Sequence, residues 1–157
     1  MADRNWRYLL FLMAAHHPKE KLDHTIRIGL GRKNIYLCSR CTGVALGILG
    51  IFAASYFGFA VPTALIFPII GFLPFFAVVD WFTQSAKLRQ SNTVLRVSSG
   101  FLLGISEGLG FLLLFSGNWL GFLVAIGFAA VYAVSVYLIA SRTRCLQAYL
   151  EELNRMS

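Results

Sequence analysis

The sequence predicts an all-α integral membrane protein, a bundle of about four transmembrane helices with a Cys/His-bearing cytoplasmic N-terminal segment. Of the 157 residues, 57% are hydrophobic and 13% are charged, whereas soluble proteins carry roughly 25% charged residues. Four apolar stretches approach the length of about 20 residues that a helix needs to cross a bilayer. All Lys and Arg residues lie outside these stretches. This composition excludes an ordinary soluble domain.

The four predicted spans follow one another closely. They cover residues 41–60, 61–82, 97–116 and 119–140. The second span contains three prolines, so we expect a helix that is kinked, or broken near Pro74. The links near residues 57–60 and 117–118 carry no charge and predict tight turns between neighbouring helices.

The distribution of Lys and Arg predicts the orientation in the membrane. Eight of these residues precede the first span, three lie between the second and third, and three follow the fourth. Because cytoplasmic loops are enriched in Lys and Arg, we expect a multi-pass protein of the cell membrane with both termini in the cytoplasm. The net charge of +7 also favours contact with anionic lipid head groups. We expect no nucleic-acid partner, because the basic residues lie next to the lipid bilayer.

The segments outside the spans have their own predicted structure. Residues 1–40 form a polar, basic segment that contains all three histidines. Within it, residues 6–15 are apolar but too short to span, and we expect a helix at the membrane interface. Residues 26–37 predict a short β-hairpin, with glycines that permit the turn. The tail, residues 141–157, predicts an amphipathic cytoplasmic helix.

Glycine recurs at every fourth position in two of the spans. The residues are Gly43 and Gly47 in the first span, and Gly100, Gly104 and Gly108 in the third. This spacing allows two helix backbones to approach closely, so we interpret it as a helix contact. A narrow path for a ligand is the alternative interpretation.

The strongest local signal is the pair Cys38 and Cys41, which two residues separate. Two thiolates at this spacing can hold one tetrahedral metal ion, and two imidazoles complete a Cys2His2 shell of the kind that zinc prefers. Upstream histidines are available at His16, His17 and His24. We therefore expect a metal site on the cytoplasmic side, with zinc as the first candidate and iron as the second.

The cysteine pair also fits two other interpretations. It could cycle between a dithiol and a disulfide, as in a membrane thiol oxidoreductase, or it could be chemically inert. Disulfides are rare in the cytoplasm unless they are catalytic or sensory, which favours the metal. Cys145 lies alone beyond the fourth span, and we expect it to take no part.

Four charged residues near or within the spans are candidates for catalysis or binding. They are Asp80, Arg89, Arg96 and Glu107. Asp80 closes the second span, where it either pairs with one of the arginines or acts as a ligand or general base. The arginines could hold a phosphate or a carboxylate through forked hydrogen bonds, or could form a solvated basic loop. Glu107 lies inside the third span, where it either bonds to a neighbouring helix in its protonated form or moves protons or ions.

Together these residues resemble the uncharacterised membrane-protein family catalogued as domain of unknown function 2085. The motifs are His16-His17-Pro18, Asp23-His24 to Gly29, Cys38-x-Arg40-Cys41-Thr42-Gly43, Asp80 with Thr83-Gln84, and Leu88-Arg89-x-Ser91-Asn92 to Leu95-Arg96 and Gly100. The resemblance covers roughly residues 15–110 and implies a small multi-spanning protein with no established reaction. Many relatives have a Cys-His pair where this chain has Ala15-His16 or His16-His17, so a three-cysteine site does not carry over.

The resemblance also implies that one set of polar residues meets at the cytoplasmic face. The set is Cys38, Cys41, Asp80, Thr83, Gln84, Arg89, Asn92 and Arg96. The preferred hypothesis is a zinc site that fixes the N-terminal segment to the bundle, beside a polar cleft of Asp80, Gln84, Arg89 and Arg96. Three alternatives stay open: a metal-dependent membrane enzyme acting on an anionic or lipid-linked substrate, a small transporter or complex subunit, and a thiol oxidoreductase. The oligomeric state is left open.

Overall fold

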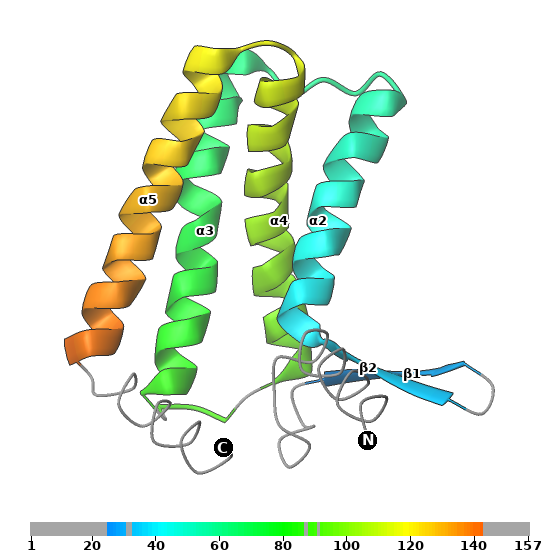
Figure 1. Ribbon diagram of the computed structural model, residues 1–157, viewed down its shortest axis with the longest axis vertical. Coiled ribbons are helices and arrows are strands. Elements are labelled where there is room, and N and C mark those ends of the chain that lie inside the picture. Colours follow the sequence, from blue (N-terminus) through cyan, green and yellow to red (C-terminus); the bar gives the residue numbers. More distant parts are fainter. Residues whose placement is uncertain (1–24, 31–32, 87, 91, 143–157) are drawn as a thin grey trace, which may run out of the picture.

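The computed structural model describes residues 25–30, 33–86, 88–90 and 92–142, which form a β-hairpin and four helices (Figure 1). The elements are β1 (Thr25–Leu30), β2 (Lys33–Cys38), α2 (Ser39–Tyr56), α3 (Thr63–Ser85), α4 (Thr93–Phe115) and α5 (Trp119–Arg142). All four helices are long and apolar enough to cross a membrane, as the sequence predicts. The interfacial helix expected at residues 6–15 and the tail helix lie outside the described residues.

The hairpin joins directly onto the first helix. Strand β1 pairs antiparallel with β2, in a register that runs from Thr25 opposite Cys38 to Leu30 opposite Lys33. This pairing confirms the predicted hairpin. Cys38 ends β2 and is the N-cap residue of α2. We call this end of the bundle, where α2 and α4 begin and α3 and α5 end, the hairpin end (Figure 1).

Helix α4 is the central element of the bundle. It packs against α2, α3 and α5, most extensively against α2, whereas α2 and α3 have little contact with each other. Figure 1 shows α2 and α5 on opposite sides, with α4 and α3 between them. The sequence suggested that successive helices are neighbours, and for α2 and α3 this is wrong because α4 lies between them. The apolar core contains Ile70, Leu109 and Leu113.

The contact between α2 and α4 depends on glycine. The glycines are Gly43 and Gly47 on α2, and Gly100 and Gly104 on α4. A Cβ atom added at Gly43 would lie closer than 3.0 Å to the backbone of Val97, and one added at Gly100 would meet the backbone of Arg40 in the same way. The two backbones therefore touch, which confirms the packing interpretation of the four-residue spacing.

Helix α3 runs through Pro68 and Pro74 without a break, so of the two outcomes expected near Pro74, a kink or a break, the break is excluded. Pro74 has no N–H to donate to the carbonyl of Ile70, which lies four residues earlier. The Ser106 hydroxyl of α4 donates to that carbonyl at 3.0 Å. One residue along, the Gly71 carbonyl accepts from the Tyr132 hydroxyl of α5 at 2.5 Å. Neighbouring helices thus supply donors where the proline interrupts the helix.

The helix connections at the opposite end are short. Gly58 and Gly117 adopt φ angles of +83° and +77°, which L-residues with side chains rarely adopt. The link from α4 to α5 is the tighter one, and the Asn118 side chain accepts a hydrogen bond from the Gly121 N–H at 2.9 Å, within the first turn of α5. The link from α4 to α5 agrees with the tight turn expected between neighbouring helices, whereas the link from α2 to α3 joins helices that have little contact.

Candidate functional site

Asp80 accepts hydrogen bonds from four side chains near the hairpin end. Its Oδ2 atom accepts from a guanidinium N–H of Arg40 and from the Ser99 hydroxyl, the latter at 3.1 Å. Its Oδ1 atom accepts from the Gln84 amide at 2.8 Å and from Arg89. The Asp80 side chain is only 6% exposed. Since the donors come from α2, α3, α4 and the loop after α3, one carboxylate joins three helices and a loop.

Further hydrogen bonds fix the positions of the arginines. The Nε of Arg89 donates to the Thr83 hydroxyl at 3.1 Å. The Nε of Arg96 donates to Oε1 of Gln84 at 2.8 Å, so Gln84 connects Arg96 to the carboxylate. The backbone N–H of Arg96 donates to the carbonyl of Asn92, the N-cap residue of α4, at 3.1 Å. Helix α4 begins four residues before the predicted span because this cap starts it at Thr93.

Among the described residues, this site carries more positive than negative charge. We define the arginine cluster as Arg40, Arg89 and Arg96 around Asp80, which places three guanidinium groups around one carboxylate. The side chains of Arg40 and Arg89 are 23% and 32% exposed. The Nε of Arg40 is buried and has no hydrogen-bond partner among the described residues. A buried N–H without a partner is uncommon in proteins. The cluster therefore has both charge and donors available for a further anion.

Arg40 is the member of the cluster that the sequence analysis missed. Asp80 was expected to pair with Arg89 or Arg96, and of these two only Arg89 bonds to it directly. Arg40 reaches Asp80 because the backbones of α2 and α4 touch at Arg40 and Gly100. Its position inside the Cys-x-Arg-Cys motif was the signal that could have identified it. Ser99 was also missed, because nothing in the sequence indicates which face of α4 points at Asp80.

The two cysteines lie at the start of α2, on either side of Arg40. The Cys38 side chain is buried and that of Cys41 is exposed, and no disulfide joins them. The two thiols are close enough to hydrogen-bond to each other. Within the described part of the chain, no three His, Cys, Asp or Glu residues are grouped as metal ligands. The other expected ligands, His16, His17 and His24, lie outside that part, as does Cys145.

A family model described as a predicted membrane protein (DUF2085) matches residues 19–110, more than half of the chain. The chain belongs to this family. The DUF2085 match includes the hairpin, α2, α3 and every residue of the arginine cluster. An "Uncharacterized protein" of Methanothermobacter thermautotrophicus is 36% identical over 74 residues, which is 44% of this chain and 62% of that protein. The matched part of this chain thus spans less than two thirds of the length of that relative. No solved structure is significantly similar to this chain.

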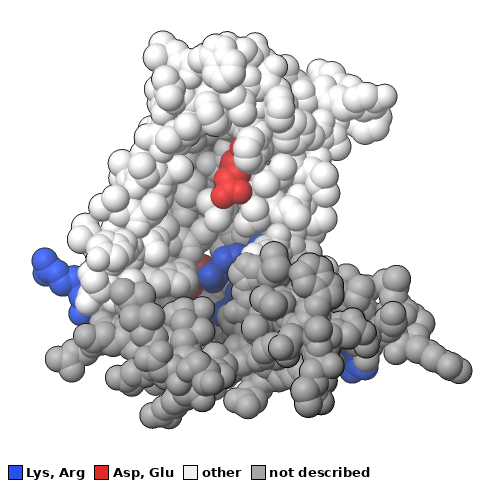
Figure 2. All heavy atoms as spheres, in the orientation of Figure 1, with Lys and Arg blue, Asp and Glu red and all other residues white. Residues whose placement is uncertain are grey.

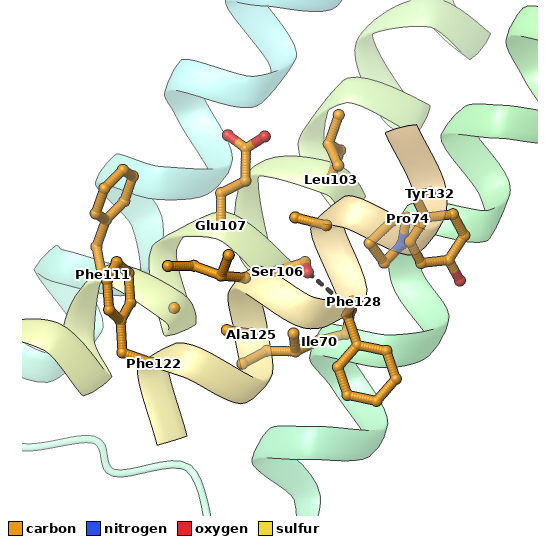
Figure 3. A pocket seen from close by; sticks show the side chains of 13 residues that line it. Ile70, Pro74, Leu103, Ser106, Glu107, Phe111, Phe122, Ala125, Phe128 and Tyr132 are labelled. Carbon is orange, nitrogen blue, oxygen red and sulfur yellow. Dashed lines mark hydrogen bonds between the residues drawn. The ribbon is translucent and has the colours of Figure 1, made fainter. Parts of the chain in front are cut away.

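Glu107 lies away from the arginine cluster of this DUF2085 protein. It lines a cavity of about 520 Å³ between α3, α4 and α5 (Figure 3). Figure 2 shows an acidic side chain in a hollow on this face of the molecule, with basic side chains near the boundary of the described residues. Glu107 is exposed and has no hydrogen-bond partner in the described part of the chain, so the bond to a neighbouring helix, one of the two alternatives for this residue, is not found there.

Proposed function

We propose that this DUF2085 protein binds the phosphate head group of an anionic lipid at the hairpin end of its helix bundle. The arginine cluster carries the proposal, because two guanidinium groups bond directly to one buried carboxylate and a third is linked to it through Gln84. Asp80 neutralises only part of that charge. Asp80 holds the guanidinium groups in place, and the bound phosphate balances the positive charge that Asp80 leaves.

The donor geometry supports a phosphate ligand. A guanidinium group carries five N–H donors in a planar fork that matches two phosphate oxygens. Arg96 uses its Nε on Gln84, and Arg40 uses one terminal nitrogen on Asp80. The remaining N–H groups of these side chains can serve a ligand. Arginine is better suited than lysine to such forked recognition, because its donors are fixed in one plane.

The location supports a lipid as the source of the phosphate. The cluster lies where α3 ends and α2 and α4 begin, at one end of four apolar helices. This is the level at which lipid head groups meet a membrane protein. We assign the hairpin end to the cytoplasm from the distribution of Lys and Arg, and the cytoplasmic leaflet is the one in which basic residues commonly bind anionic lipids.

Lipid binding to the detergent-purified chain, measured by native mass spectrometry, tests the proposal. The ligands are short-chain phosphatidic acid, phosphatidylcholine with the same acyl chains, and inorganic phosphate. We expect tight binding of phosphatidic acid alone. Binding of inorganic phosphate with equal affinity would instead indicate a soluble phosphate-bearing ligand, and equal binding of phosphatidylcholine would contradict the proposal.

Arg96→Gln is the most informative variant. Arg96 has no direct bond to Asp80, so its loss leaves the buried ion pairs intact. We expect it to weaken phosphatidic acid binding about tenfold, which corresponds to one charge-assisted hydrogen bond. The matched control is Arg142→Gln, which removes the same charge from the same end of the bundle. Arg142 is exposed and lies outside the cluster, and its loss should leave binding unchanged.

We also propose that Cys38 and Cys41 bind a zinc ion together with two of the three histidines His16, His17 and His24. The contact between these two thiols, which form no disulfide with each other, supports this proposal. Such a site would attach the N-terminal segment to the bundle. Elemental analysis of the purified chain should find about one zinc per chain, lost in the Cys38→Ser/Cys41→Ser variant.

The same analysis distinguishes the remaining metal and redox hypotheses. Iron in place of zinc, lost in the same variant, would keep the site and change the metal. A thiol count under non-reducing conditions should find both cysteines free after the metal is removed. A disulfide between Cys38 and Cys41 without any metal would contradict the zinc site and support a thiol oxidoreductase.

A further inference from the structure

The cavity between α3, α4 and α5 is large, apolar and rich in aromatic rings. Its volume of about 520 Å³ falls within the range of roughly 300–1,000 Å³ that is typical of small-molecule sites. The aromatic lining residues are Phe111, Phe122, Phe128 and Tyr132. Figure 3 shows side chains from all three helices along its walls. The cavity is therefore suited to a hydrophobic ligand.

Glu107 is the one polar lining side chain without a partner among the described residues. The Ser106 hydroxyl donates to the Ile70 carbonyl, and the Tyr132 hydroxyl donates to the Gly71 carbonyl. Glu107 makes no such bond, and its side chain is exposed at the cavity. The cavity thus offers a ligand a single carboxyl group on an otherwise satisfied apolar wall.

Glu107 also lies far from the ends of its helix. It is fourteen residues beyond Thr93, the first residue of α4, and at 1.5 Å per residue this places it about 21 Å along the helix. Leu103 and Phe111, which lie one turn before and after it, line the same cavity. An acidic side chain at this depth in a membrane is costly, and such residues usually serve a function.

We infer that this cavity binds a hydrophobic monovalent cation, such as an alkylated or arylated ammonium or phosphonium ion, with Glu107 as its counter-ion. Charge decides the class of ligand. An anion would be repelled by Glu107, and a neutral apolar ligand would leave the carboxyl group without a partner. A cation pairs with it, and the surrounding rings stabilise positive charge through their π faces. The inference is independent of the arginine cluster, which lies at the hairpin end.

Equilibrium binding of radiolabelled tetraphenylphosphonium to the detergent-purified full chain tests the inference. We expect saturable binding to the wild type, at least tenfold weaker binding to Glu107→Gln, and an intermediate affinity for Glu107→Asp. Triphenylphosphine oxide, which is neutral and has the same rings, should not compete. Absence of saturable binding to the wild type would overturn the inference, as would equal binding to a folded Glu107→Gln variant.

A second pair of variants tests the cavity without changing its charge. Ala129 lines the cavity and is exposed, whereas its neighbour Ala130 is exposed but does not line it. Ala129→Phe should therefore abolish tetraphenylphosphonium binding, and Ala130→Phe should leave it unchanged. If Glu107→Gln changed the oligomeric state by light scattering and left tetraphenylphosphonium binding intact, Glu107 would serve a contact between two copies of the chain, and the inference would be wrong.

Discussion

Arg40, at the start of α2, forms an ion pair with Asp80, near the end of α3, although these two helices have little contact with each other. The pair lies at the hairpin end, next to α4. It is possible because the backbones of α2 and α4 touch at Gly100, beside Ser99, which bonds to the same carboxylate. A glycine contact and a buried carboxylate thus act together to bring the arginines into one cluster.

The first prediction concerns the energetic coupling in this pair. Asp80→Asn leaves guanidinium groups without their counter-ion, so it should lower the free energy of unfolding by about 3 kcal/mol. Arg40→Gln should lower the free energy of unfolding by less, because Arg89 still pairs with the Asp80 carboxylate. The measurement is a double-mutant cycle of detergent unfolding. Effects that simply add would show that Arg40 and Asp80 do not interact.

A second prediction uses two glycines on the same helix. A Cβ atom at Gly47 would lie closer than 3.0 Å to the backbone of α4, whereas nothing lies within 4 Å of one at Gly50. Gly47→Ala should therefore destabilise the bundle by about 1–3 kcal/mol. Gly50→Ala should be neutral or stabilise it by up to about 1 kcal/mol, because alanine favours helix. Equal effects of the two variants would argue against close packing of α2 on α4.

The third prediction tests how α3 tolerates Pro74. Ser106→Ala removes the donor to the Ile70 carbonyl and should cost about 1–3 kcal/mol of stability. The cost should fall in a Pro74→Ala background, because the restored backbone N–H can donate to that carbonyl. Ser135→Ala is the control, since Ser135 is a comparatively exposed serine whose hydroxyl donates to the Val131 carbonyl of its own helix, α5. An undiminished cost in the Pro74→Ala background would contradict this explanation.

The fourth prediction concerns orientation. From the distribution of Lys and Arg we predict that both termini and the loop between α3 and α4 lie in the cytoplasm. A green fluorescent protein fused after residue 157 should therefore fluoresce. Alkaline phosphatase, which is active only outside the cytoplasm, should be active when fused after residue 117 and inactive after residue 157. The reverse pattern would place the hairpin end outside the cell.

The sequence was sufficient for features that depend on local pattern. Apolar length predicted four helices, the glycine spacing predicted a close helix contact, and residues 26–37 predicted the hairpin. Each of these signals comes from residues close together in the chain. The grouping of Asp80 with Arg89 was also expected, because nine residues separate them across one short loop.

The features that the sequence could not supply depend on which helices are neighbours. The sequence left a kink and a break near Pro74 as alternatives, because Ser106, which donates to the Ile70 carbonyl in place of the missing proline N–H, comes from another helix. Arg40 was missed for the same reason, since α4 had to be placed next to both α2 and α3 before its partner was evident. Of the two arginines offered as partners of Asp80, Arg89 pairs with it, whereas the Nε of Arg96 donates to the Gln84 amide oxygen.

The affinity of phosphatidic acid for wild type, Arg96→Gln and Arg142→Gln tests the central claim most directly, with all three proteins in the same detergent. We predict that Arg96→Gln binds about tenfold more weakly than the wild type, and that Arg142→Gln matches the wild type. Equal affinity in all three proteins, or an equal loss in both variants, would show that the arginine cluster is not the binding site.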